Sequence, residues 1–124
     1  MRSAEHSIAV VGAGPRGTYC LRRLMLYLRQ NPLSGQVHIH VVEKSGNFGG
    51  GGVHSPTQPA YLLLNTIGCQ ITAFGDDDHE ARASAARKTL HGYLVDQGVS
   101  IGPNDYPSRA QHGRYLADMF DWIE

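Results

Sequence analysis

A short glycine-rich run near the amino terminus has the residue types and spacing needed to bind phosphate. Its residues are Gly12, Ala13, Gly14, Pro15, Arg16 and Gly17. In a G-x-G-x-x-G turn the first glycine allows the tight bend, the second lets a pyrophosphate approach the backbone, and the third lets helix and strand pack closely. A helix that begins in such a turn offers unpaired N–H groups and a partial positive charge to the phosphates. Pro15 suits the start of that helix, because it has no N–H and its φ is preset.

Glu43 follows the next apolar run and is the expected partner of this turn. A carboxylate there accepts hydrogen bonds from a ribose hydroxyl and repels a 2′-phosphate, which disfavours NADP. Its separation from the glycines exceeds the usual spacing of about 20 residues, and a long intervening helix and loop account for the difference. Glu43 and its neighbour Lys44 are therefore candidate cofactor-binding residues. The alternative is a set of turn glycines with an incidental surface glutamate.

A second glycine cluster begins shortly after the acidic residue. Its candidate binding residues are Gly50, Gly51, Gly52 and Val53. A flavin nucleotide binds in an extended form and needs backbone access along more of its length, so this pattern favours FAD over NAD. The alternative interpretation is a flexible glycine loop.

The residues around the turn predict the elements that would position it. Residues 8–11 form an apolar run typical of a strand buried on both faces. A helical pattern follows from Arg16 to Gln30 and ends at Asn31-Pro32. Residues 37–42 are a second β-branched strand. The pattern predicts a Rossmann-like α/β fold that starts with a βαβ unit.

Downstream, the sequence predicts helices but no further clear strand. Asp76 to Asp78 could cap a helix that runs to about Gln97, and Ser108 could cap a last helix through Trp122. Two parallel strands make a poor independent sheet, because their outer edges stay unpaired. We therefore interpret residues 1–124 as a single, incomplete domain of the three-layer FAD/NAD(P)-binding type.

Composition narrows the class of partners. Eleven basic and eleven acidic side chains cancel, so no overall charge attracts nucleic acid or anionic lipid. No apolar stretch approaches the roughly 20 residues of a membrane helix. Two cysteines without metal-ligand spacing fit a reduced environment, and we expect a cytoplasmic protein.

Other side chains give weaker signals. His38 and His40 share one strand face but have no third metal ligand nearby, so we expect core or interface histidines and no metal site. His54, just after the glycines, is the better candidate for a functional histidine. Arg22 and Arg23 are expected to face solvent, and the acidic run at 76–78 to be a solvated cap. The Tyr-x-x-x-Lys pair of a short-chain dehydrogenase is absent from the sequence.

Three segments together resemble a known family. They are IAVVGAGPRGTYCLRRL, VHIHVVEKSGNFGGGGVHSPTQPAYLLLNT and YPSRAQHGRYL, and they span nearly the whole chain. The sequence is similar to the N-terminal part of the FAD/NAD(P)-binding domain of flavin-dependent monooxygenase-like proteins, which include L-aspartate N-monooxygenases and FAD-dependent urate hydroxylases.

The resemblance implies a role for several residues. It implies that the glycine turn and Glu43 hold the ADP part of FAD, and that residues 50–53 with Asn65 and Thr66 pass near the flavin. Arg109 would buttress the FAD site, whereas His112 stands where the family pattern leads us to expect an aromatic residue.

The resemblance also sets the functional hypotheses. The first is an FAD-binding segment of a flavin-dependent oxidoreductase, reduced by NAD(P)H when completed by further sequence or by a second polypeptide. The alternatives are a relict nucleotide-binding fragment without activity of its own and an NAD-binding dehydrogenase module. The catalytic residues stay unknown.

Overall fold

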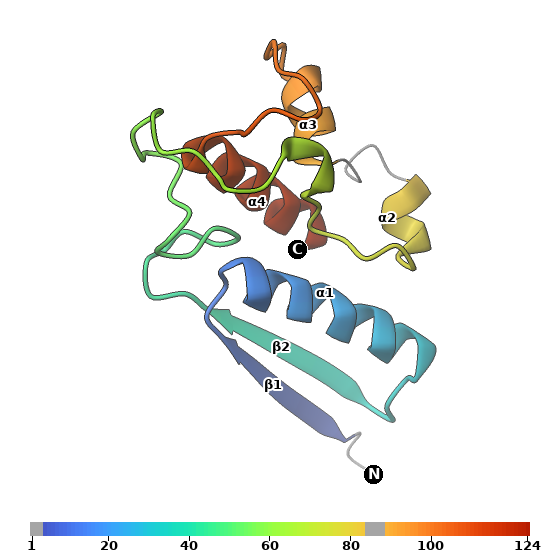
Figure 1. The fold of residues 1–124 in the computed structure, drawn as a ribbon. Helices are drawn as coiled ribbons and strands as arrows, with labels where there is room; N and C mark the ends of the chain where they lie inside the picture. Colours follow the sequence, from blue (N-terminus) through green and yellow to red (C-terminus); the bar gives the residue numbers. More distant parts are fainter. Residues whose placement is uncertain (1–3, 84–88) are drawn as a thin grey trace.

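The computed structural model describes residues 4–83 and 89–124. Two parallel strands, β1 (Glu5–Val11) and β2 (Gln36–Val42), are joined by α1 (Pro15–Gln30), which lies over one face of the sheet (Figure 1). The register pairs Glu5 with Gln36 and Val11 with Val42. The predicted α/β class and the strand–helix–strand unit are therefore confirmed.

The two faces of this sheet differ in burial. Alternate residues such as Ile39 and Val41 are partly buried and pack on the core, whereas His38 and His40 point to the other face and are exposed. Val11 is 83% exposed. The prediction of strands buried on both faces is therefore wrong for the described residues, because α1 covers one face and no second layer covers the other. The expectation of core histidines fails for the same reason.

The remaining elements are helical and make up the other half of the molecule in Figure 1. They are the 3-10 turn η1 (Gly68–Gln70), α2 (His79–Ala83), α3 (Leu90–Asp96) and α4 (Arg109–Ile123). The core lies where α4 meets α1 and the loops, and includes Leu21, Phe74, Tyr115, Leu116 and Phe120. No helix among the described residues is long and apolar enough to cross a bilayer.

The predicted cap at Ser108 is found at the start of α4, whereas α3 begins at a cap that was not predicted. Ser108 accepts a hydrogen bond from the Gln111 N–H, and the Gln111 side chain bonds back, which forms a complete capping box on α4. The predicted helix from Asp76–Asp78 to Gln97 is wrong in extent. The described part of this stretch contains the short helices α2 and α3, and Thr89 has extended backbone and caps the start of α3. Residues 84–88 lie outside the described residues.

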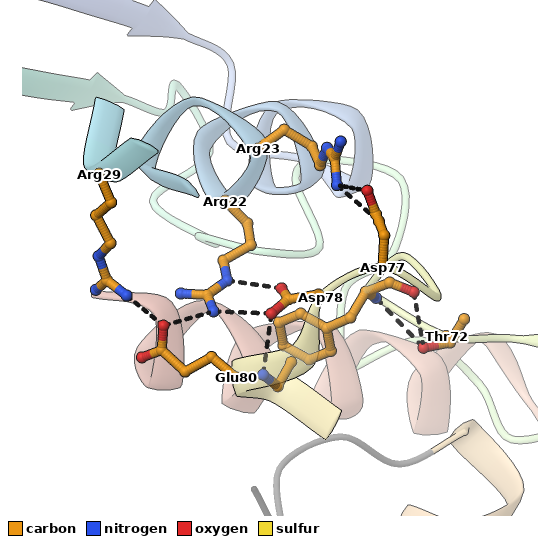
Figure 2. Close-up of polar contacts among 9 residues, drawn as sticks. Arg22, Arg23, Arg29, Thr72, Asp77, Asp78 and Glu80 are labelled. Atoms are coloured by element: carbon orange, nitrogen blue, oxygen red, sulfur yellow. Dashed lines mark hydrogen bonds and ion pairs between the residues drawn. The ribbon is translucent and has the colours of Figure 1, made fainter. Parts of the chain in front are cut away.

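The acidic run before α2 is bound to α1 by ion pairs (Figure 2). The Arg22 guanidinium donates two hydrogen bonds, of 2.8 and 3.0 Å, to the Asp78 carboxylate, and both side chains are almost fully buried. Arg22 also lies over the Trp122 ring of α4, and Asp78 accepts a hydrogen bond from the Ala81 N–H. The expectation that Arg22 and this part of the acidic run are solvated is therefore wrong.

Hydrogen bonding keeps the buried pair charged. The bond to Asp78 raises the pKa of Arg22, and the bond from Arg22 lowers the pKa of Asp78. The neighbouring pair of Arg23 with Asp77 is largely exposed. These two pairs, together with the contacts of Arg22 and Arg29 with Glu80, join α1 to the start of α2.

Candidate functional site

The predicted phosphate turn lies between the end of β1 and the start of α1. Gly12 has φ +94°, a backbone conformation that residues other than glycine rarely adopt. Its N–H donates to the Val42 carbonyl at 2.7 Å. A Cβ at Gly17 would lie 1.8 Å from the Gly12 carbonyl oxygen. Glycine is therefore favoured at position 12 by the backbone conformation and is required at position 17 by the close approach of helix and turn.

The start of α1 has the features of an anion site. Gly14 is the N-cap, it provides no side-chain cap, and Pro15 follows at the first helical position. The first turn of α1 contains no acidic side chain. The N–H groups of this turn and the positive end of the helix are therefore left for a ligand.

Glu43 is held against the turn by the register of the sheet. Because Val11 pairs with Val42, the residue after β2 lies beside the turn, and the Ala13 N–H donates to Glu43 Oε1 at 3.1 Å. The hydroxyl and N–H of Ser45 bind the other carboxylate oxygen at 2.5 and 2.7 Å. These bonds lower the pKa of Glu43, that from the Ser45 hydroxyl most, so the carboxylate is ionised at neutral pH.

The second glycine loop, residues 47–54, packs directly on the phosphate turn. The Gly49 N–H donates to the Ala13 carbonyl at 2.7 Å, and a Cβ at Gly51 would be 3.0 Å from the Gly14 Cα. The Asn47 side chain closes the loop by donating to the carbonyls of Gly51 and His54. The two glycine clusters that the sequence separates thus form one surface of backbone atoms.

These pieces surround one open cavity of about 790 Å³, the nucleotide cavity. That volume is in the range of small-molecule and cofactor sites. Its walls include the following predicted residues: Gly12, Gly14, Pro15, Arg16, Gly17, Glu43, Gly50, Gly51, Gly52 and Val53. His54, the predicted functional histidine, also lines it.

The other predicted site residues lie outside this cavity. Lys44 is exposed and is not in its wall. Asn65, Thr66 and Arg109 come from two segments that pair with each other, through a bridge between Leu63 and Ser108. The Leu64 N–H donates to the Pro107 carbonyl, and the Arg109 N–H donates to the Leu62 carbonyl, both at 2.8 Å. The structure thus brings these segments together at the start of α4.

Four residues near the cavity were missed as site residues by sequence reasoning. Cys20 lines the cavity one turn into α1, Ser45 and Asn47 hold Glu43 and the second glycine loop, and His112 contacts His54. Ser and Asn between an acidic residue and a run of glycines are typical turn formers, and that signal could have identified Ser45 and Asn47. The sequence contains no comparable signal for Cys20 or His112.

A separate cavity of about 620 Å³ between β2, α1 and α4 is mainly apolar. Its polar lining residues, Asp121 and Glu124, are acidic, so it would repel phosphate. The nucleotide cavity is therefore the better candidate site.

Comparison with known proteins gives consistent results. The family described as FAD-NAD(P)-binding matches residues 9–123. An L-aspartate N-monooxygenase (nitrosuccinate-forming) of Streptomyces davaonensis is 32% identical over 138 residues, which cover 98% of this chain and 21% of that protein. Nitrosuccinic acid synthase npaA of Aspergillus oryzae is 35% identical over 115 residues, with 91% and 18% covered. A second L-aspartate N-monooxygenase, of Streptomyces cremeus, is 33% identical over 135 residues, with 92% and 20% covered. The chain thus spans about a fifth of the length of these relatives.

Proposed function

The chain belongs to the FAD-NAD(P)-binding family, and from this premise we propose that it binds FAD with the ADP part on the turn at residues 12–17. One observation carries the proposal: the phosphate turn, Glu43 and the second glycine loop line the same cavity. A complete dinucleotide site needs an anion site, an acceptor for ribose and room for the second nucleotide half. Each of these has a counterpart in the wall of this cavity.

We assign each part of the cofactor to residues along the cavity wall. The first turn of α1 and Arg16 would hold the pyrophosphate, and the ionised Glu43 would accept a ribose hydroxyl while repelling a 2′-phosphate. A Cβ at Gly14 would have no atom of another segment nearer than 3.8 Å, so the space above this glycine is open to a ligand. The exposed Gly52 and Val53 extend the backbone surface toward the flavin end.

We further propose that the chain is the FAD-binding segment of an oxidoreductase of the monooxygenase type. FAD supplies the redox chemistry when bound, with NAD(P)H as the reductant in the complete enzyme. This segment binds and orients the cofactor, and further polypeptide would supply the substrate site. The relatives' names and the exposed second face of the sheet support this proposal.

The test is the visible spectrum of the purified chain after incubation with FAD and gel filtration. We expect flavin bands to co-elute with the folded chain. Gly14→Ala and Gly14→Val should reduce binding progressively, because each added group occupies the space proposed for the pyrophosphate. Circular dichroism of each variant checks that the fold persists.

Two results would contradict the proposal. In one, the folded chain elutes without flavin at any FAD concentration. In the other, Gly14→Val binds FAD as well as the unaltered chain does. Competition by NAD at lower concentration than FAD would instead favour an NAD-binding module.

A further inference from the structure

Two histidines without a role in the proposed function meet beside the phosphate turn. His54 ends the second glycine loop, and His112 lies near the start of α4. Their ring centroids are 4.6 Å apart and their planes are inclined at 73°, so the rings meet edge to face. His112 also lines a neighbouring cavity of about 310 Å³, which shares Pro15 and Arg16 with the nucleotide cavity. The pair thus belongs to the walls of two cavities that meet at the start of α1.

Backbone contacts beside the ring pair join the second glycine loop to α4. A Cβ at Gly113 would lie 2.3 Å from the His54 carbonyl oxygen, and one at Gly49 would lie 2.2 Å from the Leu116 carbonyl oxygen. The opposite side of the loop touches the phosphate turn through Gly51. Side chains add to this junction through the histidine ring pair and through Phe48 of the loop, whose ring centroid lies 5.3 Å from that of Phe120 in α4.

The hydrogen bonding of the two rings favours their neutral forms. The Nδ1 atoms of His54 and His112 are buried and have no hydrogen-bond partner among the described residues. A neutral imidazole can leave one nitrogen as an unpaired acceptor, whereas an imidazolium must bury an unpaired, charged donor at greater cost. Burial lowers the pKa of His112 to about 4, and burial followed by the charge of Arg109 lowers the pKa of His54.

The surroundings contain little that could stabilise a protonated ring. The titratable and charged groups that face the pair or its two cavities are Arg16, Tyr19, Cys20, Glu43, Arg109 and Tyr115. Both arginines are cations. The one carboxylate among these groups already accepts bonds from Ala13 and Ser45.

We propose that His54 and His112 are positioning residues of the nucleotide site, whose neutral rings hold the second glycine loop on α4 and whose protonation releases the loop. The inference rests on the proposed function, because the loop lines the cavity that we assign to FAD. Cofactor affinity should then be full when both rings are neutral and should fall as the pH falls.

The test is the FAD dissociation constant of the 124-residue chain, measured by flavin fluorescence between about pH 7 and pH 4, so that the range reaches the His112 pKa of about 4. We expect it to rise on acidification, by at most about tenfold per pH unit for one linked proton. His112→Phe keeps an aromatic edge-to-face contact and removes the titration. Its FAD dissociation constant should then lose most of the pH dependence between low and neutral pH, whatever the affinity of this variant at pH 7.

A control and a substitute variant keep the test decisive. His40→Asn removes an exposed histidine on the uncovered sheet face and should leave the pH dependence unchanged. If His112→Phe does not fold, His54→Phe takes its place. A pH-independent dissociation constant for the unaltered chain, or a His112→Phe profile that follows it, would overturn the proposal.

A second readout separates this inference from the proposed function. If the folded chain binds no FAD even at pH 7, the proposed function fails, and hydrogen exchange then tests the ring pair alone. The N–H groups of Gly49 and Gly51, bonded to the carbonyls of Ala13 and Asn47, should lose protection on acidification. They should keep it in His112→Phe. Equal protection factors at pH 7 and pH 4 in the unaltered chain would contradict the proposal that protonation of the ring pair releases the loop.

Discussion

At the scale of single residues, the phosphate turn is determined by distances to backbone atoms. Gly14 and Gly17 are both glycines of the same motif, yet the structure gives them different constraints. The space at Gly14 is open, whereas the Gly12 carbonyl oxygen fills the position of a Cβ at Gly17. One glycine is therefore available to a ligand, and the other is required by the fold.

This difference predicts opposite phenotypes for two matched substitutions. Gly17→Ala should lower the free energy of unfolding by about 1–3 kcal/mol or more, because backbone must move to relieve the clash. Gly14→Ala should lower it by at most about 1 kcal/mol, the scale of an N-cap exchange. Urea unfolding of both variants checks the prediction, and equal stabilities would contradict it.

At the scale of elements, the buried ion pair is the main polar link between α1 and the start of α2. Asp78→Asn would leave the Arg22 guanidinium buried with only the more distant Glu80, at 3.4 Å, as an acidic partner. We expect a loss of about 3 kcal/mol, since breaking a buried pair leaves an uncompensated charge.

The neighbouring pair provides the control for this prediction. Asp77→Asn removes the partner of Arg23 in a pair that is largely exposed, and it should cost about 1 kcal/mol or less. Both losses are measurable by chemical denaturation at neutral pH. Equal decreases in the free energy of unfolding of the two variants would contradict the prediction that the buried pair stabilises the fold more than the exposed pair.

The elements were predictable from sequence where the signal is local. Periodicity and caps predicted α1, the parallel strands and the start of α4 at Ser108. The burial of Arg22 was not predictable, because it depends on Asp78, more than 50 residues along the chain. The start of α3 was missed although its signal is local, since the Thr89 side chain accepts a hydrogen bond from the Gly92 N–H. At the candidate site, the glycines and Glu43 could be identified from spacing. The contact between His54 and His112 could not, since it joins a loop to a helix more than 50 residues later.

At the scale of the whole molecule, buried titratable groups predict how stability depends on pH. His112 has a pKa of about 4 in the folded chain, below its ordinary value of 6.5. The unfolded chain therefore binds more protons between these values, and the free energy of unfolding should fall as the pH falls from about 6.5 to about 4. We expect about 1–2 kcal/mol from this group, allowing for its partial exposure.

Carboxylates add a second phase at lower pH. The hydrogen bond from Arg22 lowers the pKa of Asp78 in the folded chain. The contribution of Asp78 to the free energy of unfolding is therefore present above the ordinary pKa of 3.8, and it is lost as the pH falls through the lower pKa of the folded chain. Urea unfolding across this range should show both phases. His112→Phe should flatten the upper phase and leave the lower one, and an unchanged upper phase in this variant would contradict the assignment to His112.

The glycine contacts on both sides of the second glycine loop have a mechanical consequence. Gly51 meets Gly14 on one side, while Gly49 and Gly113 bring the loop against α4 on the other. Peptide groups have no rotamers, so the gap above the phosphate turn cannot be widened by turning a side chain. While the loop stays packed on α4, widening the gap would therefore displace α4 as well. In that packed state, a displacement of α4, which does not line the cavity, would reach the mouth of the cavity through the loop.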